Sequence, residues 1–336
     1  MDVVVIDPHD AAAFDAWFDV LHVTDLERWP DKPGWQRAER LAWALSTDGA
    51  EEHRCLAVYG PDGAVLGIAD LEMFRLENTH VARVDVRVLP EARRRGVGRA
   101  IMAEVEGLAL GAGRTELGGM DEVPVRAGFV DPGAPFAESL GFASAQHLVR
   151  RSINLPVPAA LMQALAFSPK AAPAGYSLIT FRDRWPDEFI TDRCELGRRM
   201  STDIPMGEQD LDEEVWDEQR VRRMEAEIAA QNRSKLTTAA HHDATRTLVA
   251  FTEVAIPLGA PSSSWQHDTL VMREHRGHGL GYAVKVANLA AVMETYPDVR
   301  TISTWNAAEN EHMIAVNEEI GFEVVAHSTY WLKKLG

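Results

Sequence analysis

Two short segments of this chain combine arginine and glycine at the same spacing. Residues 93–98 read Arg-Arg-Arg-Gly-Val-Gly and residues 276–281 read Arg-Gly-His-Gly-Leu-Gly, so both fit the pattern R-x-x-G-x-G. An apolar alternating stretch precedes each segment and a helical pattern follows it. Glycines at the start of a helix leave successive backbone N–H groups uncovered, and such a site can hold a pyrophosphate. These segments therefore predict phosphate binding at two places.

Carboxylates recur at matched distances before the two segments. Asp85 and Asp268 lie eight residues before the first arginine, and Asp70 and Glu253 lie 23 residues before it, inside strand-like stretches. A carboxylate in such a position can take the proton that an ammonium ion must lose before it reacts as an amine, directly or through water. Glu253 is our candidate for this base. The alternative is a solvated strand residue that faces away from the site.

The repeated landmarks indicate a duplication of one domain. They predict an N-terminal domain over 1–153, a linker over 154–175 and a C-terminal domain over 176–336. The linker carries four prolines around the helix-like stretch Ala159–Ala166. A chain of 336 residues is long enough for two domains that each bury a core.

Strands and helices alternate in the same order in both halves. In the first half, Cys55–Tyr59 and Val65–Leu71 flank an Asp-Gly turn, which is a hairpin signal, and a strand over Val84–Leu89 leads into the glycine segment. A helix is expected over 98–110. In the second half we expect strands over 235–239 and 248–256, joined by a turn at 241–243. This order predicts an α/β (α+β) fold with a mixed sheet, used twice.

Composition narrows the class of function. The formal net charge is −17, from 34 Lys and Arg against 51 Asp and Glu, and a field of this sign repels nucleic acid. No apolar run approaches a membrane span, so we expect a cytoplasmic protein that inserts into no membrane. Cys55 and Cys194 are expected to be structural thiols. The histidines near the loops lack the other ligands of a zinc site, so no metal is expected.

Both glycine segments, with the strands that lead into them, resemble the acyl-CoA pyrophosphate loop of the GNAT acyltransferase superfamily. The tandem arrangement resembles mycothiol synthase and related actinobacterial two-domain acetyltransferases. The resemblance implies two GNAT domains, acetyl-CoA as acyl donor and a primary amine as acceptor. It implies the following cofactor-binding residues: Val88, Leu89, Arg93, Arg94, Arg95, Gly96, Val97 and Gly98, and Val271, Met272, Arg273, Arg276, Gly277, His278, Gly279, Leu280 and Gly281. Lys285 is a further expected source of charge for the phosphates.

The halves differ where the family has an asparagine followed by a tyrosine before its closing Gly-Phe. The second half keeps Asn310 but has Asn317 in place of the tyrosine, and the first half has Ala137 there. We therefore expect the second half to be catalytic and the first to be degenerate. The resemblance implies catalytic roles for Glu253 and for Asn317 at the position of the tyrosine, although Asn317 cannot donate a proton as a tyrosine can. Tyr282 is expected to pack rather than to replace the tyrosine.

The remaining site residues are expected around the pantetheine arm and the acceptor. Asn306 and Asn310 are predicted to bind the arm, although Asn306 could equally cap a helix. Asp203 and Glu208 begin the acidic segment 203–214, which is predicted to line the mouth for an amine. The alternative is a set of acids that favour a helix N-terminus.

The sequence thus predicts an acetyl-CoA-dependent N-acetyltransferase that acts on a primary amine of a small molecule, such as an amino sugar or an antibiotic. A non-catalytic acyl-CoA-binding protein and a protein N-acetyltransferase are the alternatives. The sequence is compatible with a monomer or a homodimer.

Overall fold

The computed structural model describes residues 1–46, 49–126, 128–203 and 207–336. These residues form two compact units. Unit 1 comprises Met1–His147, Gly207–Asp210 and His327–Gly336, and unit 2 comprises Leu148–Met206 and Leu211–Ala326. The two units are therefore not consecutive stretches of chain. Unit 1 contains the end of the chain, and unit 2 contains the second part of the strand 143–154.

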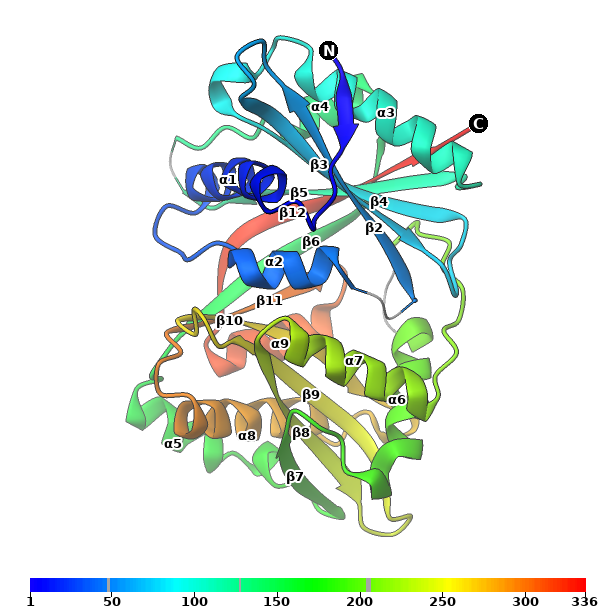
Figure 1. Ribbon diagram of the computed structural model, residues 1–336. Coiled ribbons are helices and arrows are strands. Elements are labelled where there is room, and N and C mark those ends of the chain that lie inside the picture. The colour runs from blue at the N-terminus through cyan, green and yellow to red at the C-terminus, as the bar shows by residue number, and fades with distance from the viewer. Residues whose placement is uncertain (47–48, 127, 204–206) are drawn as a thin grey trace. The chain divides into compact units, whose positions relative to one another are not determined.

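Unit 1 is a mixed sheet between helices on its two faces (Figure 1). Its strand order is β1-β2-β3-β4-β5-β12, and only β4 and β5 are shown as a parallel pair. The elements are β1 (Val3–Val5), α1 (Ala11–Arg28), α2 (Arg37–Ala44), β2 (Glu51–Tyr59), β3 (Val65–Phe74), β4 (Val81–Val88), α3 (Val97–Gly111), β5 (Glu116–Pro124), α4 (Gly133–Ser139), the beginning of β6 (Ala143–Asn154) and the end of β12 (Glu323–Lys334).

Unit 2 repeats this design with the strand order β6-β11-β10-β9-β8-β7. Among the strand pairs of its described residues, β10 and β11 form the parallel one. The elements are α5 (Ala159–Ala166), β7 (Tyr176–Arg182), α6 (Ile190–Asp203), α7 (Glu218–Ala230), β8 (Arg233–His242), β9 (Thr247–Pro257), β10 (Ser263–Val271), α8 (Leu280–Thr295), β11 (Thr301–Ala307) and α9 (Glu311–Ile320), with the end of β6 and the beginning of β12.

Period-two alternation in β9 separates the two faces of the unit 2 sheet. Val254 and Ile256 belong to the apolar cluster that includes residues of α8, whereas Phe251 belongs to the cluster with Leu196 of α6 and Val221 of α7. Helix α8 thus covers one face, and α6 and α7 cover the other. The predicted α/β fold with a mixed sheet is confirmed.

Two details differ from the sequence-based expectation. Strand β8 continues through His241 and His242, so the turn before β9 lies at 243–246 rather than at 241–243. The last strand of each repeat is also divided between the two units: β6 and β12 each have one part in unit 1 and the other part in unit 2. In unit 2, Leu148–Asn154 of β6 pairs antiparallel with β11, and in unit 1 the indole of Trp331, on β12, donates to Asp121 of β5. Each strand follows a Gly-Phe pair at the end of its repeat, so sequence alone does not tell which sheet each one joins.

Among the described residues, no helix is both long enough and apolar enough to cross a bilayer.

Candidate active site

The two glycine loops have the same backbone shape. Each follows a strand and a short 3-10 turn, and each ends at a left-handed glycine that begins the next helix: Gly96 with φ 88° before α3 and Gly279 with φ 78° before α8. Two residues earlier, Arg94 and Gly277 are also left-handed, with φ 62° and 85°. Neither helix N-terminus receives a side-chain cap in the part of the chain that the structure describes. The first-turn N–H groups are thus left for an anion, which fits a pyrophosphate.

Glycine at 277 is required by the backbone and not by crowding, because no atom lies within 4 Å of a Cβ built there. A side chain in the left-handed region costs about 1–2 kcal/mol. We therefore expect Gly277→Ala to lower the free energy of unfolding by about 1 kcal/mol, and Arg94→Gly, at the matching place in unit 1, to cost nothing or to raise it slightly. Urea unfolding of both variants measures this. A loss for Arg94→Gly as large as that for Gly277→Ala would contradict it.

The first arginine of each motif donates a hydrogen bond to the last backbone carbonyl of the strand before its own loop. Arg93 donates through Nε to the Val88 carbonyl and pairs with Glu27 of α1, with Nη2–Oε2 at 2.5 Å. Arg276 donates through Nε to the Val271 carbonyl at 3.2 Å. Its Nη2 lies 3.4 Å from the backbone oxygen of Asp203 and 3.7 Å from the Asp203 carboxylate. The remaining loop arginines of unit 1, Arg94 and Arg95, are exposed.

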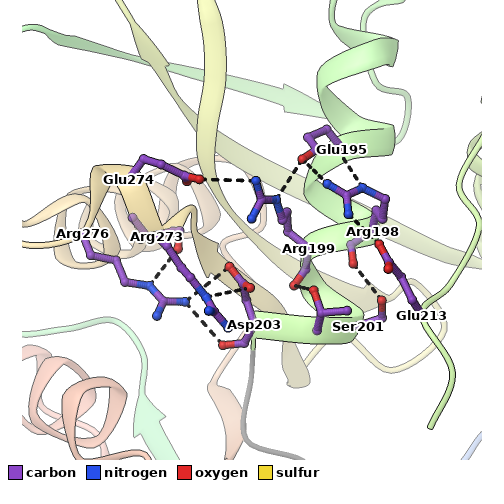
Figure 2. A network of polar contacts seen from close by, with 11 residues as sticks. Glu195, Arg198, Arg199, Ser201, Asp203, Glu213, Arg273, Glu274 and Arg276 are labelled. Carbon is purple, nitrogen blue, oxygen red and sulfur yellow. Dashed lines mark hydrogen bonds and ion pairs between the residues drawn. The ribbon is translucent and has the colours of Figure 1, made fainter.

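Asp203, predicted to bind the amine, lies at the end of α6 beside this loop (Figure 2). Its side chain is only 3% exposed and also accepts a 2.9 Å ion pair from Nε of Arg273. The Asp203 carboxylate therefore faces the loop residues Arg273 and Arg276. Glu208 is exposed, and its backbone N–H donates to Ala145 within unit 1. Residues 204–206 of the acidic segment lie outside the described residues.

The strand pairing next to the loop differs between the units. In unit 1, β3 and β4 pair without interruption from Gly67–Val88 to Met73–Ala82, with Asp70 opposite Asp85. In unit 2 the register of β9 and β10 shifts between Gln266 and Thr269. His267 and Asp268 thus form a β-bulge opposite Glu253. A bulge leaves backbone groups outside the ladder, and a free N–H there can stabilise the oxygen of a reacting carbonyl.

Both units open a gap between their parallel strands. In unit 2, β10 and β11 pair only from Ser263–Thr301 to Trp265–Ser303, although both strands continue beyond this point. In unit 1, β4 and β5 also pair over three positions. Strands that diverge beyond a short paired region leave room for an extended ligand. Unit 2 combines this gap with the bulge and the loop.

Glu253 points to the α6–α7 face of the sheet and is 1% exposed. Its Oε1 accepts hydrogen bonds from Nε1 of Trp185 at 3.2 Å and Oγ1 of Thr237 at 3.1 Å. Its Oε2 lies 3.0 Å from Nζ of Lys235. The alternative that Glu253 is a solvated strand residue is therefore wrong. Glu253 and residues of β8, α6 and α7 line a small pocket that is partly open to solvent.

Burial alone would raise the pKa of Glu253, but Lys235 and Arg193 together lower it to about 2. A carboxylate with so low a pKa remains ionised at neutral pH and is not matched to general-base chemistry there. It is instead a permanent acceptor for an N–H group. In unit 1, burial raises the pKa of Asp70 to about 7, although Arg40 of α2 pairs with it.

Lys235, Trp185, Thr237 and Arg193 were missed by the sequence analysis as site residues. The register explains two of the contacts: Thr237 is directly opposite Glu253, and Lys235 lies two residues earlier on the same face of β8. The signal available in the sequence was a lysine in the expected strand 235–239. Arg193 had no signal in the sequence, because its position depends on how α6 packs.

Lys285 was expected to add charge for the phosphates, but its side chain is buried in unit 2 instead. It is 3% exposed and donates from Nζ to Oε1 of Gln266, on β10, at 3.1 Å. Gln266 in turn donates to the backbone oxygen of Glu253 at 2.6 Å. Burial lowers the pKa of Lys285 to about 7. The lysine is thus attached to the bulge from the α8 face of the sheet.

The asparagines form a separate group on β11 and α9. Asn310 is the N-cap of α9 and accepts from the Met313 N–H, so the cap is Asn310 and not Asn306. Asn317 is fully buried and donates to Oδ1 of Asn306 at 2.7 Å. Tyr282 packs as expected, with its hydroxyl donating to the Leu165 carbonyl at 3.2 Å.

Comparisons with known proteins agree with this geometry. Residues 14–142 match the model of the acetyltransferase (GNAT) family. No curated protein matches the chain. Among solved structures, a tandem GNAT protein from the clavulanic acid biosynthesis pathway, determined without AcCoA, is 29% identical with a TM-score of 0.79, covering 100% of this chain and 98% of that one.

Two more distant structures share the fold. A GCN5-related N-acetyltransferase from Sphaerobacter thermophilus is 17% identical with a TM-score of 0.68, covering 99% of this chain and 95% of that one. N-myristoyltransferase of Saccharomyces cerevisiae, solved with myristoyl-CoA, is 10% identical with a TM-score of 0.59, covering 99% and 80%. Residues 14–142 thus match the acetyltransferase (GNAT) family, and the whole chain has the fold of a tandem GNAT protein.

Proposed function

We propose that this protein transfers an acetyl group from acetyl-CoA to a primary amine of a small molecule, and that unit 2 carries the reaction. The observation that carries the proposal is the bulge opposite Glu253, beside a pocket and a left-handed glycine loop. Unit 1 has the loop but an unbroken strand ladder. We assign to unit 1 a structural role in which its loop can still hold an acyl-CoA.

In this proposal the thioester of acetyl-CoA supplies the activated acetyl group. The N–H groups of Leu280 and Gly281, at the start of α8, hold the pyrophosphate. The gap between β10 and β11, near Asn306, takes the pantetheine arm. A backbone N–H of the bulge polarises the carbonyl, and Glu253 holds an N–H of the amine. Neither Asn317 nor Tyr282 is placed to protonate the leaving group, so it departs as a thiolate, with a thiol pKa near roughly 8.5, and the proton released by the attacking amine passes to water.

The proposal that the acceptor is a small molecule is more specific than the fold alone supports, and it rests on the pocket. A small, partly open pocket suits a compact molecule better than a folded protein surface. The resemblance to mycothiol synthase and the cytoplasmic location remain expectations from the sequence. A non-catalytic acyl-CoA-binding protein is the second candidate, because an asparagine stands in place of the family tyrosine in unit 2.

Two measurements on the full chain separate the candidates. Calorimetric titration with acetyl-CoA reports binding and the number of sites, and a thiol-detecting dye reports CoA release in the presence of amines. We expect binding, together with CoA release that depends on the amine and yields an acetylated product by mass. Tight binding without release on any amine would contradict acetyl transfer and favour the binding protein.

A further inference from the structure

Arg193 of α6 is a buried cation without a counter-ion in the part of unit 2 that the structure describes. The residue is 3% exposed, and its Nη1 has no hydrogen-bond partner. The guanidinium carbon lies 4.3 Å from the ring centre of Trp216, 5.2 Å from Phe251 and 5.3 Å from Trp185. Aromatic faces compensate only part of the cost of burying a charge. Arg193 also lines the pocket that Glu253 lines.

Unit 1 shows what a balanced version of this arrangement looks like. Arg40 also lies among three aromatic rings, those of Trp17, Trp35 and Trp43, but it pairs with the strand carboxylate Asp70. In unit 2 the corresponding strand carboxylate, Glu253, is paired with Lys235. Arg193, which lies among aromatic rings in unit 2, therefore has no such carboxylate partner.

The other acids of the pocket do not neutralise Arg193. Glu225 accepts from Nη1 of Arg222 at 3.0 Å and from the Trp185 backbone N–H at 2.8 Å. Asp183 accepts from the Ser234 hydroxyl and pairs with Arg182 at 3.3 Å. Glu253 and Asp268 of the bulge both attract Arg193 and Lys235 electrostatically, but neither carboxylate forms an ion pair with Arg193 in the described part of unit 2. Nη1 of Arg193 is therefore left without an acceptor.

We propose that the acceptor is an amino carboxylic acid, whose carboxylate binds Arg193 while its amine is held at Glu253. The proposal rests on the proposed function of the same site. A carboxylate offers the guanidinium a planar, charge-assisted pair of hydrogen bonds, and it removes the cost of the unpaired charge. The free lone pairs of Glu253 Oε2, beside Lys235, accept the amine N–H. Arg193 and Glu253 line the same pocket, which is partly open to solvent.

The test compares acids with matched neutral compounds. The full chain, saturated with CoA, is titrated by calorimetry with the standard L-amino acids, β-alanine and 4-aminobutyrate, and then with the amide and the decarboxylated amine of each acid that binds. We expect at least one acid to bind at least tenfold more tightly than its amide. In Arg193→Gln this acid-to-amide ratio falls toward one, and Arg193→Lys recovers part of it.

Arg220→Gln is the matched control. Arg220 also lies over Trp216, at 4.7 Å, but it pairs with Glu214 at 3.2 Å and does not line the pocket. It should keep the wild-type ratio. Because acid and amide are measured on the same preparation, the ratio does not depend on the folded fraction of a variant.

The inference is overturned if no acid binds, if amides bind as tightly as acids, or if Arg193→Gln leaves the ratio unchanged. CoA release on neutral amines, with no preference for a carboxylate, would overturn it and leave the proposed function standing. Binding of an acid that depends on Arg193, but without CoA release, would support the site and contradict acetyl transfer.

Discussion

Glu253→Gln is expected to lower kcat/KM for acetyl transfer by about 10²-fold. A hydrogen bond to a charged group contributes roughly 1.5–3 kcal/mol, and 1.36 kcal/mol corresponds to a factor of ten in rate. The substitution removes the anion that holds the amine, and it leaves Lys235 and Arg193 to repel each other in a buried site. CoA release at saturating acetyl-CoA measures the effect, normalised to the folded protein by circular dichroism.

The pH profile tests the role of Glu253 separately. Its pKa of about 2 lies far below the working range, so between pH 5 and 9 Glu253 carries the same charge throughout. We therefore expect Glu253→Gln to lower the whole profile and to keep its shape, because the acid limb reports protonation of the amine itself. An acid limb with a pKa of 6 to 7 that disappears in the variant would show that Glu253 titrates as a base during catalysis.

Asp70→Asn is the matched substitution in unit 1. Asp70 has a pKa of about 7, which would suit a general base, but the pairing of its strand with β4 has no bulge. We expect this variant to be less stable, because Arg40 loses its partner, and to keep most of its rate per folded molecule. If Asp70→Asn and not Glu253→Gln abolished the reaction, the active site would have to be assigned to unit 1.

The loops could be predicted because they depend on local backbone chemistry. Glycine is the residue that adopts left-handed φ at little cost, and a glycine at the start of a helix therefore marks the turn directly. Arg94 shows the limit of this reasoning, since it is left-handed with φ 62° without being glycine. Its conformation follows from the matching position in the repeat and not from its own residue type.

The environment of Glu253 depends on register and on packing between distant elements. Lys235 reaches Glu253 because β8 and β9 pair with Thr237 opposite Glu253, and a shift of one residue would have turned Lys235 to the other face. The bulge is a further irregularity of register that leaves no mark in the sequence of β10. Charge type and spacing could therefore locate the carboxylate, but they could not supply its partners.

The expectation for Lys285 was wrong because it also depended on packing, in this case the packing of helix α8. Charged residues usually mark the solvated face of a helix. Nearly the whole first half of α8 is buried, from Leu280 to Val286, so this helix has no solvated face there. A lysine within such a stretch is directed to a polar group of the core, in this case Gln266.

Lys285→Met is expected to stabilise the protein by about 1–3 kcal/mol at pH 6.5. The pKa of Lys285 is about 7 in the folded protein and 10.5 as a free side chain. A shift of about 3.5 units corresponds to a cost on the order of 5 kcal/mol for keeping the buried amine protonated. Part of the gain is offset, because Gln266 loses the donor to its Oε1. Met102, 183 residues earlier, shows that methionine packs at the matching position.

The sign with pH follows from proton uptake. Below about pH 7 both states of the wild type are protonated, and the full cost is present. Between pH 7 and 10.5 the unfolded chain binds the proton and the folded one does not, so wild-type stability rises with pH. Urea unfolding at pH 6.5, 8.5 and 10 should show the advantage of the variant shrinking. An advantage that grows with pH, or a variant less stable at pH 6.5, would contradict this account.

A buried lysine that lowers stability is expected to serve the function of the protein, and its hydrogen bonds indicate how. Lys285 holds Gln266, and Gln266 holds the backbone oxygen of Glu253 opposite the bulge. We therefore expect Lys285→Met to release CoA more slowly than the wild type while it unfolds at higher urea, which is the usual trade between stability and activity. The reciprocal Met102→Lys, in unit 1, should destabilise the protein without the effect on rate, because β3 and β4 have no bulge for it to hold.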